Sequence, residues 1–432
     1  MKLKRLLEED PLVILDGGRR TPRADILHEN KRPGKFASLS TNQLGGIAIK
    51  ATLEHSGVSP DQIGHVIMAQ ALESHRDSIY AARIMALEAG IPKEVPALTV
   101  RRLCGSGAQA IVNACHQLLL EDHLPGRPYL VAGGAESMQY PHIVYGLRGK
   151  PAKQGIVKYG AVACDQMPPG TFAQDLLHMA LFDPMAGMAM ANTAEKVARQ
   201  YGISREASDA FAYRSHRLAH QAQHKGWFEE EITPIEVPVY GSHEREWVRS
   251  DTHVRPDISL QSLARLPVVF EPPHGVLTPG NASGVVDGAA AMIVTRKATA
   301  QQAGQHILAR IAGWGIAGCE PSLMGLGPVP ATRFALEMAG ISGAQIDHVE
   351  LNEAFAPQAL ACIQEFETLG IDPSKVNPLG NAIALGHPLG ATGAILTLTC
   401  AYHLRRTHGR YGLVTMCIGG GQGIALILEN RE

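Results

Sequence analysis

The residue with the clearest chemical potential is a cysteine in a turn between two predicted elements. Cys104 follows the short apolar run Pro96–Val100, which predicts a buried strand, and precedes an amphipathic helix that is regular from Ala108 onward. We expect Gly105 and Gly107 to let the backbone bend between the two elements. The free N–H groups and the dipole at a helix start favour a thiolate, so Cys104 is a candidate nucleophile. The alternative is a buried structural cysteine.

Three further segments carry reactive residues among glycines, alanines and turn formers. Asn352 directly follows a predicted strand and could orient a water or a carbonyl, or serve as a helix N-cap. His387 stands between a glycine and a proline and is either a general base or oxyanion donor, or an ordinary turn histidine. Cys417 precedes a glycine-rich hairpin, Gly419–Gly421, whose N–H groups could bind an oxyanion or form only a tight turn.

Two cysteines and a histidine at such junctions favour acyl transfer combined with proton transfer at carbon. One thiolate would take the acyl group and the histidine would activate it. The second thiol would move a proton on or off carbon.

The elements that must position these residues alternate between strands and helices, which predicts an α/β fold with a mostly parallel sheet covered by helices. The pattern restarts near residue 305, and Cys417 follows His387 by 417 − 387 = 30 positions as Gly134 follows Cys104 by 134 − 104 = 30. The second half is therefore expected to copy the first, with the two turns facing each other in one site. Strands are predicted at 12–15, 65–69, 128–132, 285–295, 307–316, 348–351, 412–416 and 423–428, and helices at 41–55, 78–89, 331–339, 354–369 and 389–404.

The stretch between these two halves has a different composition. From about residue 137 to 284 it is rich in Met, Pro, His and polar residues, and only two helices stand out, at 192–201 and 204–225. Such a stretch is typical of an inserted lid or loop domain. We therefore predict a first half at 1–136 plus 285–302, an inserted loop domain at 137–284, and a second half at 303–432.

Composition sets broad limits on function. The 432 residues are 45% hydrophobic and 19% charged, as in ordinary globular proteins of more than one domain. A net charge of -2 gives no reason to expect nucleic acid, and no apolar run of about 18 residues is long enough to span a membrane. Seven cysteines without a Cys-x-x-Cys pair fit a reduced, cytoplasmic setting.

The reactive segments, taken together and in order, resemble the signatures of the thiolase family. The resemblance runs from about Leu12 to Glu429. It implies a thiolase fold, in which two α/β/α-layered halves stack as five layers (α-β-α-β-α) and a loop domain is inserted into the first half. The matching segments are Leu103–Gly107, Gly280–Ala290, Asn352–Phe355, Gly386–Pro388 and Cys417–Gly419.

The resemblance also implies a reaction, the reversible thiolytic cleavage of a 3-oxoacyl-CoA by CoA through an acyl-cysteine. Cys104 would be the acylated nucleophile and His387 its activator. Cys417 would be the acid/base at carbon. Asn352 would hold a water that binds the enolate oxygen together with His387, and the N–H groups of Cys104 and Gly419 would form the second oxyanion hole. CoA is then a substrate, and neither a separate cofactor nor a metal is expected.

Four other residues match family positions near the CoA-linked substrate. Ser283 would contact the pantetheine, and Arg255 and Ser262 would lie near the nucleotide, although Arg255 could equally be a solvated surface arginine. Met190 is retained in a segment where short-chain biosynthetic thiolases have a histidine in place of Ala189. This departure favours a degradative 3-ketoacyl-CoA thiolase of fatty-acid β-oxidation over a biosynthetic acetoacetyl-CoA thiolase.

The resemblance further implies an assembly. Homodimers and homotetramers are expected, and Arg214-Ser-His216 is similar to the thiolase subunit of fatty-acid oxidation complexes, which pairs with a hydratase/dehydrogenase α subunit. The segment Gln139–Met190 matches nothing in the family and is a candidate acyl tunnel or docking surface.

Three rival functions fit part of the pattern. A ketoacyl synthase has the same fold and nucleophile but uses two histidines, where this chain has Asn352 and Cys417. A cysteine hydrolase needs water access and leaves the second cysteine without a role. A non-catalytic CoA-binding subunit needs none of the motifs intact.

Overall fold

A computed structural model of the chain describes residues 7–27, 32–75, 77–139, 142–145 and 172–430. None of the helices in these ranges is long and apolar enough to cross a lipid bilayer. The strands of the first half are β1 (Leu12–Leu15), β4 (Ile63–Ala69), β5 (Ala97–Val100), β6 (Tyr129–Glu136) and β13 (Val286–Arg296), and its helices are α2 (Thr41–Ser56), α3 (Ala81–Glu88) and α4 (Ser106–Leu120). The strands of the second half are β14 (Ile307–Gly318), β15 (Ile346–Leu351), β16 (Tyr411–Ile418) and β17 (Gln422–Glu429), and its helices are α10 (Pro328–Ala339), α11 (Ala356–Thr368) and α13 (Leu389–Thr407).

The strand pairing repeats from one half to the other. In the first half β4 runs parallel to β5 and β6, and the path continues antiparallel through β13 to β1. In the second half β15 runs parallel to β16 and to a bridge at Val376, and the path continues antiparallel through β17 to β14. The predicted copy is therefore present. The prediction of a mostly parallel sheet is confirmed within each half, because a single strand, β13 in the first half and β17 in the second, runs against the others named above. The two halves join antiparallel, through β1 and β14.

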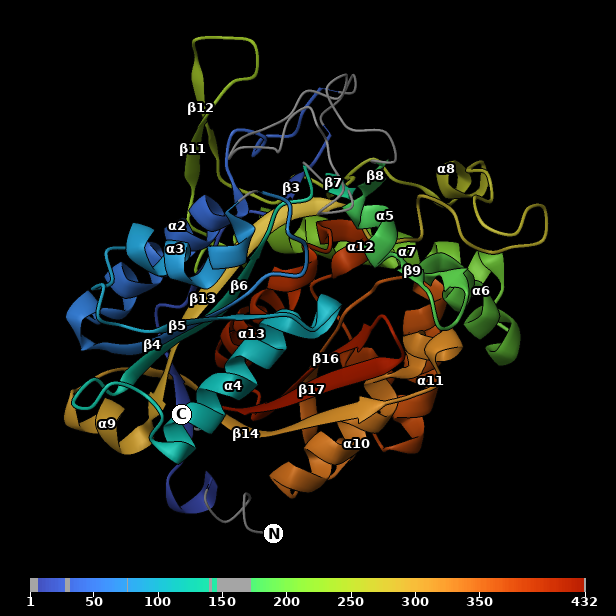
Figure 1. The fold of residues 1–432 in the computed structure, drawn as a ribbon. Coiled ribbons are helices and arrows are strands. Elements are labelled where there is room, and N and C mark those ends of the chain that lie inside the picture. The colour runs from blue at the N-terminus through green and yellow to red at the C-terminus, as the bar shows by residue number, and fades with distance from the viewer. Residues whose placement is uncertain (1–6, 28–31, 76, 140–141, 146–171, 431–432) are drawn as a thin grey trace, which may run out of the picture.

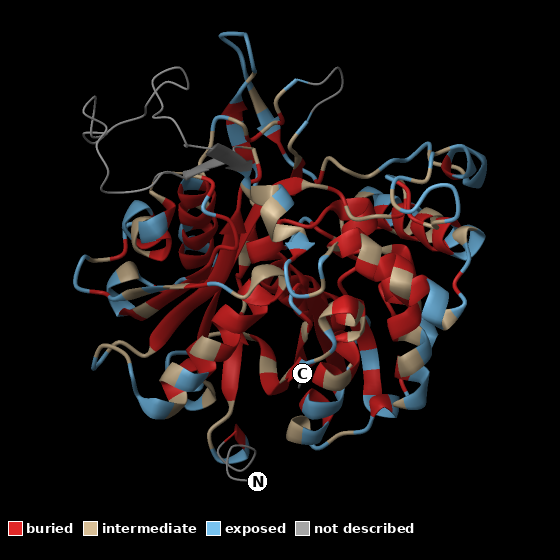
Figure 2. Cartoon of the chain, turned by 45° about the vertical axis from the view of Figure 1, so that its right-hand side comes forward, coloured by how far each residue is buried: buried red, intermediate tan, exposed pale blue. Residues whose placement is uncertain are grey.

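The elements stack in five layers (Figure 1). Helices α2 and α3 cover the outer face of the first half and α10 covers that of the second, while α4 and α13 lie between the two halves of the sheet. The buried residues divide in the same way, with one apolar cluster around α4 and α13 and one under each outer layer. Figure 2 shows the strands and the two central helices as mostly buried. Burial of two sheet faces against the central pair fixes where the turns before α4 and α13 meet.

Local sequence signals explain most of the element ends. At α2 the Ser40 hydroxyl caps the helix by accepting a hydrogen bond from the backbone N–H of Gln43, and Gly57 closes the helix with φ of 69°. The prediction that the strand before Cys104 is buried is wrong. That strand, β5, lies at the edge of the sheet, and Leu98 is 40% exposed, because the strand has a neighbour, β4, on one side only among the described residues.

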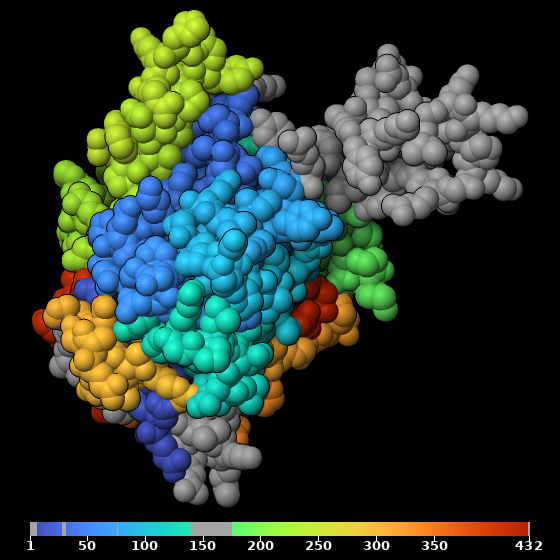
Figure 3. All heavy atoms as spheres, turned by 60° about the vertical axis from the view of Figure 1, so that its left-hand side comes forward, coloured from blue at the N-terminus to red at the C-terminus, as the bar shows by residue number. Residues whose placement is uncertain are grey.

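The inserted stretch contains the two predicted helices, α6 (Met190–Tyr201) and α7 (Arg205–His224). It also forms the hairpin of β11 (Ile235–Pro238) and β12 (Arg245–Val248), which projects from the body as the yellow-green ridge in Figure 3. A buried ion-pair cluster ties the insertion to the first half, since Arg20 contacts Glu231 at 2.6 Å and Asp251 at 2.7 Å. The short elements β7 (His142–Tyr145), β8 (Phe172–Asp175), α5 (Leu176–Ala180), β9 (Phe182–Asp183), β10 (Met188–Ala189) and α8 (Leu260–Ala264) complete it.

Candidate active site

Cys104 sits in a strained turn directly before α4. It lies in a single 3-10 turn, Leu103–Gly105, and Leu103 takes a left-handed φ of 44°, which is costly for a branched side chain. Gly105 itself has φ of -84°, so the bend is at Leu103 and not at the glycines as predicted. The glycines instead allow close packing, because a Cβ on Gly107 would lie 2.7 Å from the backbone nitrogen of Ala394 in α13.

His387 is held from three sides at the start of α13. Its backbone N–H donates to the carbonyl of Gly284 at 2.9 Å, and its Nδ1 lies 2.6 Å from the Thr392 hydroxyl. That hydroxyl donates its single proton to the Pro388 carbonyl at 3.0 Å, so it must accept the Nδ1–H. The proton is thereby fixed on Nδ1, and Nε2 carries the lone pair, 3.4 Å from the side-chain nitrogen of Asn352. This is the tautomer that a general base requires.

Asn352 follows β15 but does not cap the next helix. Its backbone N–H donates to Thr415 of β16 at 3.0 Å, and α11 begins later, with Phe355 at its N-cap position. The N-cap alternative is therefore wrong. The side-chain Oδ1 of Asn352 is buried and accepts no hydrogen bond from the described part of the chain. A buried acceptor without a partner is the kind of atom that binds a water or a substrate group.

The two candidate sulfurs meet beside the Gly419 amide. The backbone N–H of Gly419 donates to the sulfur of Cys104, and Cys104 is close enough to Cys417 to raise the pKa of the Cys417 thiol. Cys417 is 1% exposed at the end of β16 and packs against Met190 and Met324. The two sulfurs thus form one pair and the side chains of His387 and Asn352 another, and the turn of Cys104 packs against α13, the helix that follows His387.

The electrostatics of the site depart from the expectation of a preformed thiolate. Burial raises the pKa of the Cys104 thiol to about 11, although the N–H groups of Gly419 and of Cys104 itself act in the opposite direction. Burial also raises the pKa of Cys417. Both thiols are therefore protonated at neutral pH, because loss of solvation outweighs the helix start. A base must remove the proton of Cys104, and Nε2 of His387, which carries the lone pair of the imidazole, fits that task.

The hydroxyl of Thr392 is a positioning group that sequence reasoning missed. Replacing Thr392 with valine should lower kcat/KM for the reaction of this site by about 10- to 100-fold, since the imidazole loses the contact that fixes its tautomer and orientation. Thr392→Ser keeps the hydroxyl and should keep most of the activity. Steady-state kinetics of the two variants tests this, and equal losses in both would contradict it.

Glu136 is a second residue that the sequence did not reveal. It is fully buried at the end of β6, and its carboxyl group accepts hydrogen bonds from the backbone N–H groups of Ala71, Leu72 and Gly390 at 2.9, 3.2 and 2.9 Å. Burial raises the pKa of Glu136 to about 8, although the three hydrogen bonds act to lower it. Because Gly390 lies in the first turn of α13, Glu136 joins the first half to the helix that carries His387.

The residues expected near CoA fall into two groups. Ser283 lies beside the site, since its N–H donates to Ala354 and the next residue, Gly284, holds the His387 backbone. Met190 packs beside Cys417 and Gly419.

The two residues expected near the nucleotide lie elsewhere, on the surface of the insertion. Arg255 is exposed, and its backbone N–H donates to the imidazole of His216. Ser262 is exposed on the short helix α8, where its hydroxyl donates to the Ser259 carbonyl at 2.8 Å.

The segment Arg214-Ser-His216 is structural in this chain. The Ser215 hydroxyl donates to the buried carboxyl group of Glu353 at 2.6 Å, and Arg214 donates to the carbonyl of Val376 at 2.8 Å. These contacts hold the loop that follows Asn352. Ala189, where biosynthetic relatives of the family were expected to have histidine, is the N-cap residue of α6.

His216 predicts how stability depends on pH. Its Nδ1 accepts the Arg255 N–H at 3.1 Å, and burial, with His253 and Arg255 nearby, lowers its pKa from 6.5 to about 3. Between these values the unfolded chain binds more protons, so stability should fall as pH drops below 6.5, by about 1 kcal/mol per pH unit. His216→Gln, whose amide can still accept the N–H, should reduce the slope by this amount in urea unfolding at pH 7, 6 and 5, while the lowered pKa values of His348, His387 and His403 maintain the remainder. His224→Gln, on the exposed side of α7, should leave the slope unchanged.

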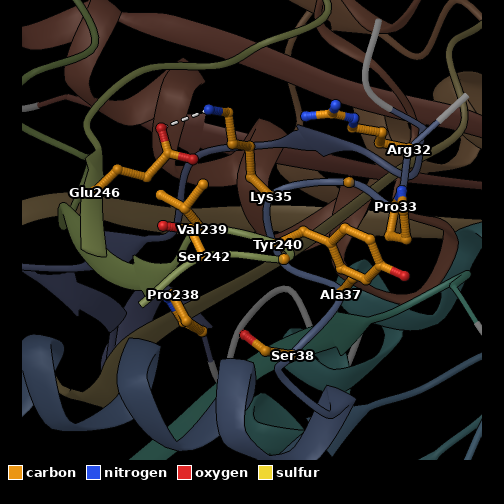
Figure 4. A pocket seen from close by; sticks show the side chains of 12 residues that line it. Arg32, Pro33, Lys35, Ala37, Ser38, Pro238, Val239, Tyr240, Ser242 and Glu246 are labelled. Carbon is orange, nitrogen blue, oxygen red and sulfur yellow. Dashed lines mark hydrogen bonds and ion pairs between the residues drawn. The ribbon is translucent and has the colours of Figure 1, made fainter. Parts of the chain in front are cut away.

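A further feature of the described residues is a cavity between the first half and the insertion. About 500 Å³ in volume, it is bounded by the loop 32–38 and the hairpin β11–β12, and the ion pair of Lys35 with Glu246 spans it at 2.5 Å (Figure 4). None of the candidate catalytic residues lines it.

Part of the segment Gln139–Met190, expected to shape an acyl tunnel or a docking surface, lies outside the described residues, at 140–141 and 146–171. In the described part, Leu176 and Leu177 of α5 pack in the apolar cluster that includes Cys104. Leu181 joins the cluster around Cys417. This end of the segment therefore supplies apolar walls next to both sulfurs.

Comparison with known proteins identifies the family. The family model described as "Thiolase, N-terminal domain" matches residues 20–298, and the model described as "Thiolase, C-terminal domain" matches residues 305–430. Beta-ketothiolase BktB of Cupriavidus necator is 42% identical over 92% of this chain and 95% of its own. Human mitochondrial 3-ketoacyl-CoA thiolase is 41% identical over 92% of this chain and 94% of its own length. Acetyl-CoA acetyltransferase of Shinella zoogloeoides is 40% identical over 92% of this chain and 95% of its own length.

Solved structures agree with these matches. The crystal structure of human mitochondrial 3-ketoacyl-CoA thiolase superposes with a TM-score of 0.86 at 39% identity, covering 98% of this chain and 99% of that one. A structure of the same human protein in complex with CoA gives a TM-score of 0.85 at 39% identity, covering 98% of each chain. The predicted thiolase fold is confirmed, and the chain belongs to the thiolase family.

Proposed function

We propose that this protein is an acyltransferase that cleaves 3-oxoacyl-CoA with CoA, giving acetyl-CoA and an acyl-CoA shortened by two carbons. The observation that carries the proposal is the pairing of Cys104 with Cys417 beside the Gly419 amide and of His387 with Asn352, with the turn of Cys104 packed against the helix that follows His387. Thiolysis of a carbon–carbon bond needs a nucleophile, a base for it, and a separate acid for the departing carbon, and this set supplies all three.

The proposed first half-reaction follows from the protonation states. Nε2 of His387 takes the proton of Cys104, and the thiolate attacks the 3-oxo carbon, whose oxygen accepts N–H bonds from Cys104 and Gly419. The carbon–carbon bond breaks, and the enolate of acetyl-CoA, its oxygen held by His387 and by a water on Asn352, takes a proton from Cys417. In the second half-reaction the Cys417 thiolate takes the proton of the CoA thiol, and the CoA thiolate attacks the acyl-Cys104 thioester. The shortened acyl-CoA leaves, and the released Cys104 thiolate regains its proton from His387.

The degradative direction is the finer part of the proposal. Ala189 and the apolar residues Leu176, Leu177 and Leu181 beside the sulfurs support a substrate with a longer acyl chain than acetoacetyl-CoA. Relatives at similar identity include both a 3-ketoacyl-CoA thiolase and acetyl-CoA acetyltransferases. The alternative function is therefore biosynthetic condensation of two acetyl-CoA molecules.

Thiolysis rates across a series of 3-oxoacyl-CoA chain lengths test the proposal. A degradative enzyme should show higher kcat/KM at six or more carbons than at four, and a biosynthetic one the reverse. Decarboxylation of malonyl-CoA would instead favour a ketoacyl synthase, and acyl-CoA hydrolysis without free CoA would favour a cysteine hydrolase. Absence of all these activities would favour a non-catalytic CoA-binding subunit.

CoA-binding roles and assembly complete the proposal. Ser283 is proposed to contact the pantetheine and Arg255 with Ser262 the nucleotide, with CoA as substrate and no further cofactor. A homodimer or homotetramer is supported by the edge strand β5, where Leu98 is exposed with Ile79 and Tyr80 nearby in the chain. An oxidation-complex α subunit is a further candidate partner. The six cysteines in the described residues are free, which supports a reduced, cytoplasmic location.

A further inference from the structure

Arg23 is a buried cation whose charge is only partly compensated. It follows the strand β2 (Arg19–Arg20), is 1% exposed, and its Nε lies 3.7 Å from Asp251. Asp251 makes its shorter contacts with the Arg20 guanidinium, at 2.7 and 2.9 Å. The Nε and one Nη of Arg23 donate no hydrogen bond to any residue that the structure describes. Buried arginines are normally paired and hydrogen-bonded, so this arrangement is unusual.

The side chain of Arg23 runs toward the turn that carries His387. A Cβ placed on Gly288 of β13 would lie 3.6 Å from Cγ of Arg23 and 3.4 Å from Cγ of Pro388. The missing side chain at Gly288 thus leaves the space in which Arg23 approaches the residue next to His387. Its charge acts on both the His387 imidazole and the carboxyl group of Glu350.

We propose that Arg23 is a positioning residue for the reaction: its buried guanidinium supplies a fixed positive charge close to the turn of His387, which adds to the effect of burial in keeping the imidazole neutral and able to accept a proton. The inference rests on the proposed function, in which His387 takes the proton of Cys104. Arg23 touches neither the thiol nor the substrate in this role, and acts only through His387.

The groups around both partners support this direction of effect. The partners of the His387 side chain are Asn352 and Thr392, which are uncharged, and burial followed by the charge of Arg23 lowers the pKa of His387 to about 4.

The charged groups that face Arg23 are Arg20, Asp251, Glu231 and Glu350. Two of them, Asp251 and Glu231, pair with Arg20. Glu350 is hydrogen-bonded by His348 and Asn381, and its pKa is raised by burial to about 8, so it offers Arg23 little negative charge. The field of Arg23 at His387 is therefore not cancelled.

The test is the pH dependence of thiolysis in the full-length protein. Arg23→Met removes the charge with little change in volume and should move the acidic limb of the kcat/KM profile upward by about one pH unit, because the imidazole then protonates more easily. Arg23→Lys keeps the charge and should keep the wild-type midpoint. Arg245→Met, on the exposed strand β12, is the matched control and should leave the profile unchanged.

The outcomes separate this inference from the proposed function. An upward shift in Arg23→Met that Arg23→Lys reverses supports the inference. An unshifted acidic limb in a folded, active Arg23→Met enzyme overturns it, while an inactive wild-type enzyme would overturn the proposed function instead. Should Arg23→Met fail to fold, Arg23→Gln carries the same test, with the fold checked by circular dichroism at each pH.

Discussion

Replacing Cys104 by serine is expected to abolish formation of the acyl-enzyme and to lower the rate of thiolysis by on the order of 10⁴-fold or more. The serine hydroxyl fits the strained turn, so the fold should be unchanged. Its pKa, however, is far above that of a thiol, and the neutral imidazole of His387 is too weak a base to ionise it. Incubation with a labelled acyl-CoA, followed by mass spectrometry of the intact protein, measures the loss directly.

Cys319→Ser provides the matched control for this variant. Cys319 is a free, partly exposed cysteine just after β14, and its N–H donates to the Gly421 carbonyl at 2.7 Å. Its sulfur has no role in the proposed mechanism, so the variant should acylate at the wild-type rate. Acylation that persists in Cys104→Ser at another cysteine would show that the nucleophile has been assigned to the wrong residue.

How far the sequence could lead is clearest at the site itself. Cys104, Asn352, His387 and Cys417 were recognisable because each stands in a short motif at a predicted strand end, where glycines and prolines mark the turn. The cap at Ser40 and the two helices of the insertion were also readable from local signals. Such features depend on residues within a few positions of one another.

Features that depend on distant partners were not readable. The hydroxyl of Thr392 looks like any helix residue until its contacts with His387 and Pro388 are known, and Glu136 gains its meaning from N–H groups in two other segments. The reversed direction of β13 and β17 was missed for the same reason, because strand direction is set by pairing across the chain. The bend of the turn was assigned to the neighbouring glycines, although it lies at Leu103 and Gly107 instead provides space for α13.

Ionisation was the least predictable property. A helix start alone argues for a thiolate at Cys104, yet the sequence does not say how deeply the sulfur is buried. The structure reverses the expected direction of the pKa shift. In the proposed mechanism the reaction therefore begins with a proton transfer to His387, which makes the neutral state of that imidazole a requirement.

The second large effect is expected at Cys417, where serine should separate the two halves of the reaction. Cys104, His387 and Gly419 remain in place, so Cys417→Ser should still take an acyl group from acyl-CoA and return it to CoA. Cleavage and formation of the carbon–carbon bond need an acid of suitable pKa at the departing carbon, which a hydroxyl cannot supply. We expect these steps to slow by about 10²- to 10⁴-fold.

Two measurements on the same protein distinguish the steps: exchange of label between acyl-CoA and CoA, and cleavage of a 3-oxoacyl-CoA. Cys362→Ser is the control, since that buried sulfur donates to the Gly325 carbonyl at 3.1 Å, a bond that serine can also make. If the two sulfurs have different catalytic roles, Cys417→Ser should show exchange without cleavage. Cys362→Ser should retain both exchange and cleavage. Full cleavage by Cys417→Ser would mean that another group protonates the carbon, and among the residues gathered here His387 would then have to serve both steps.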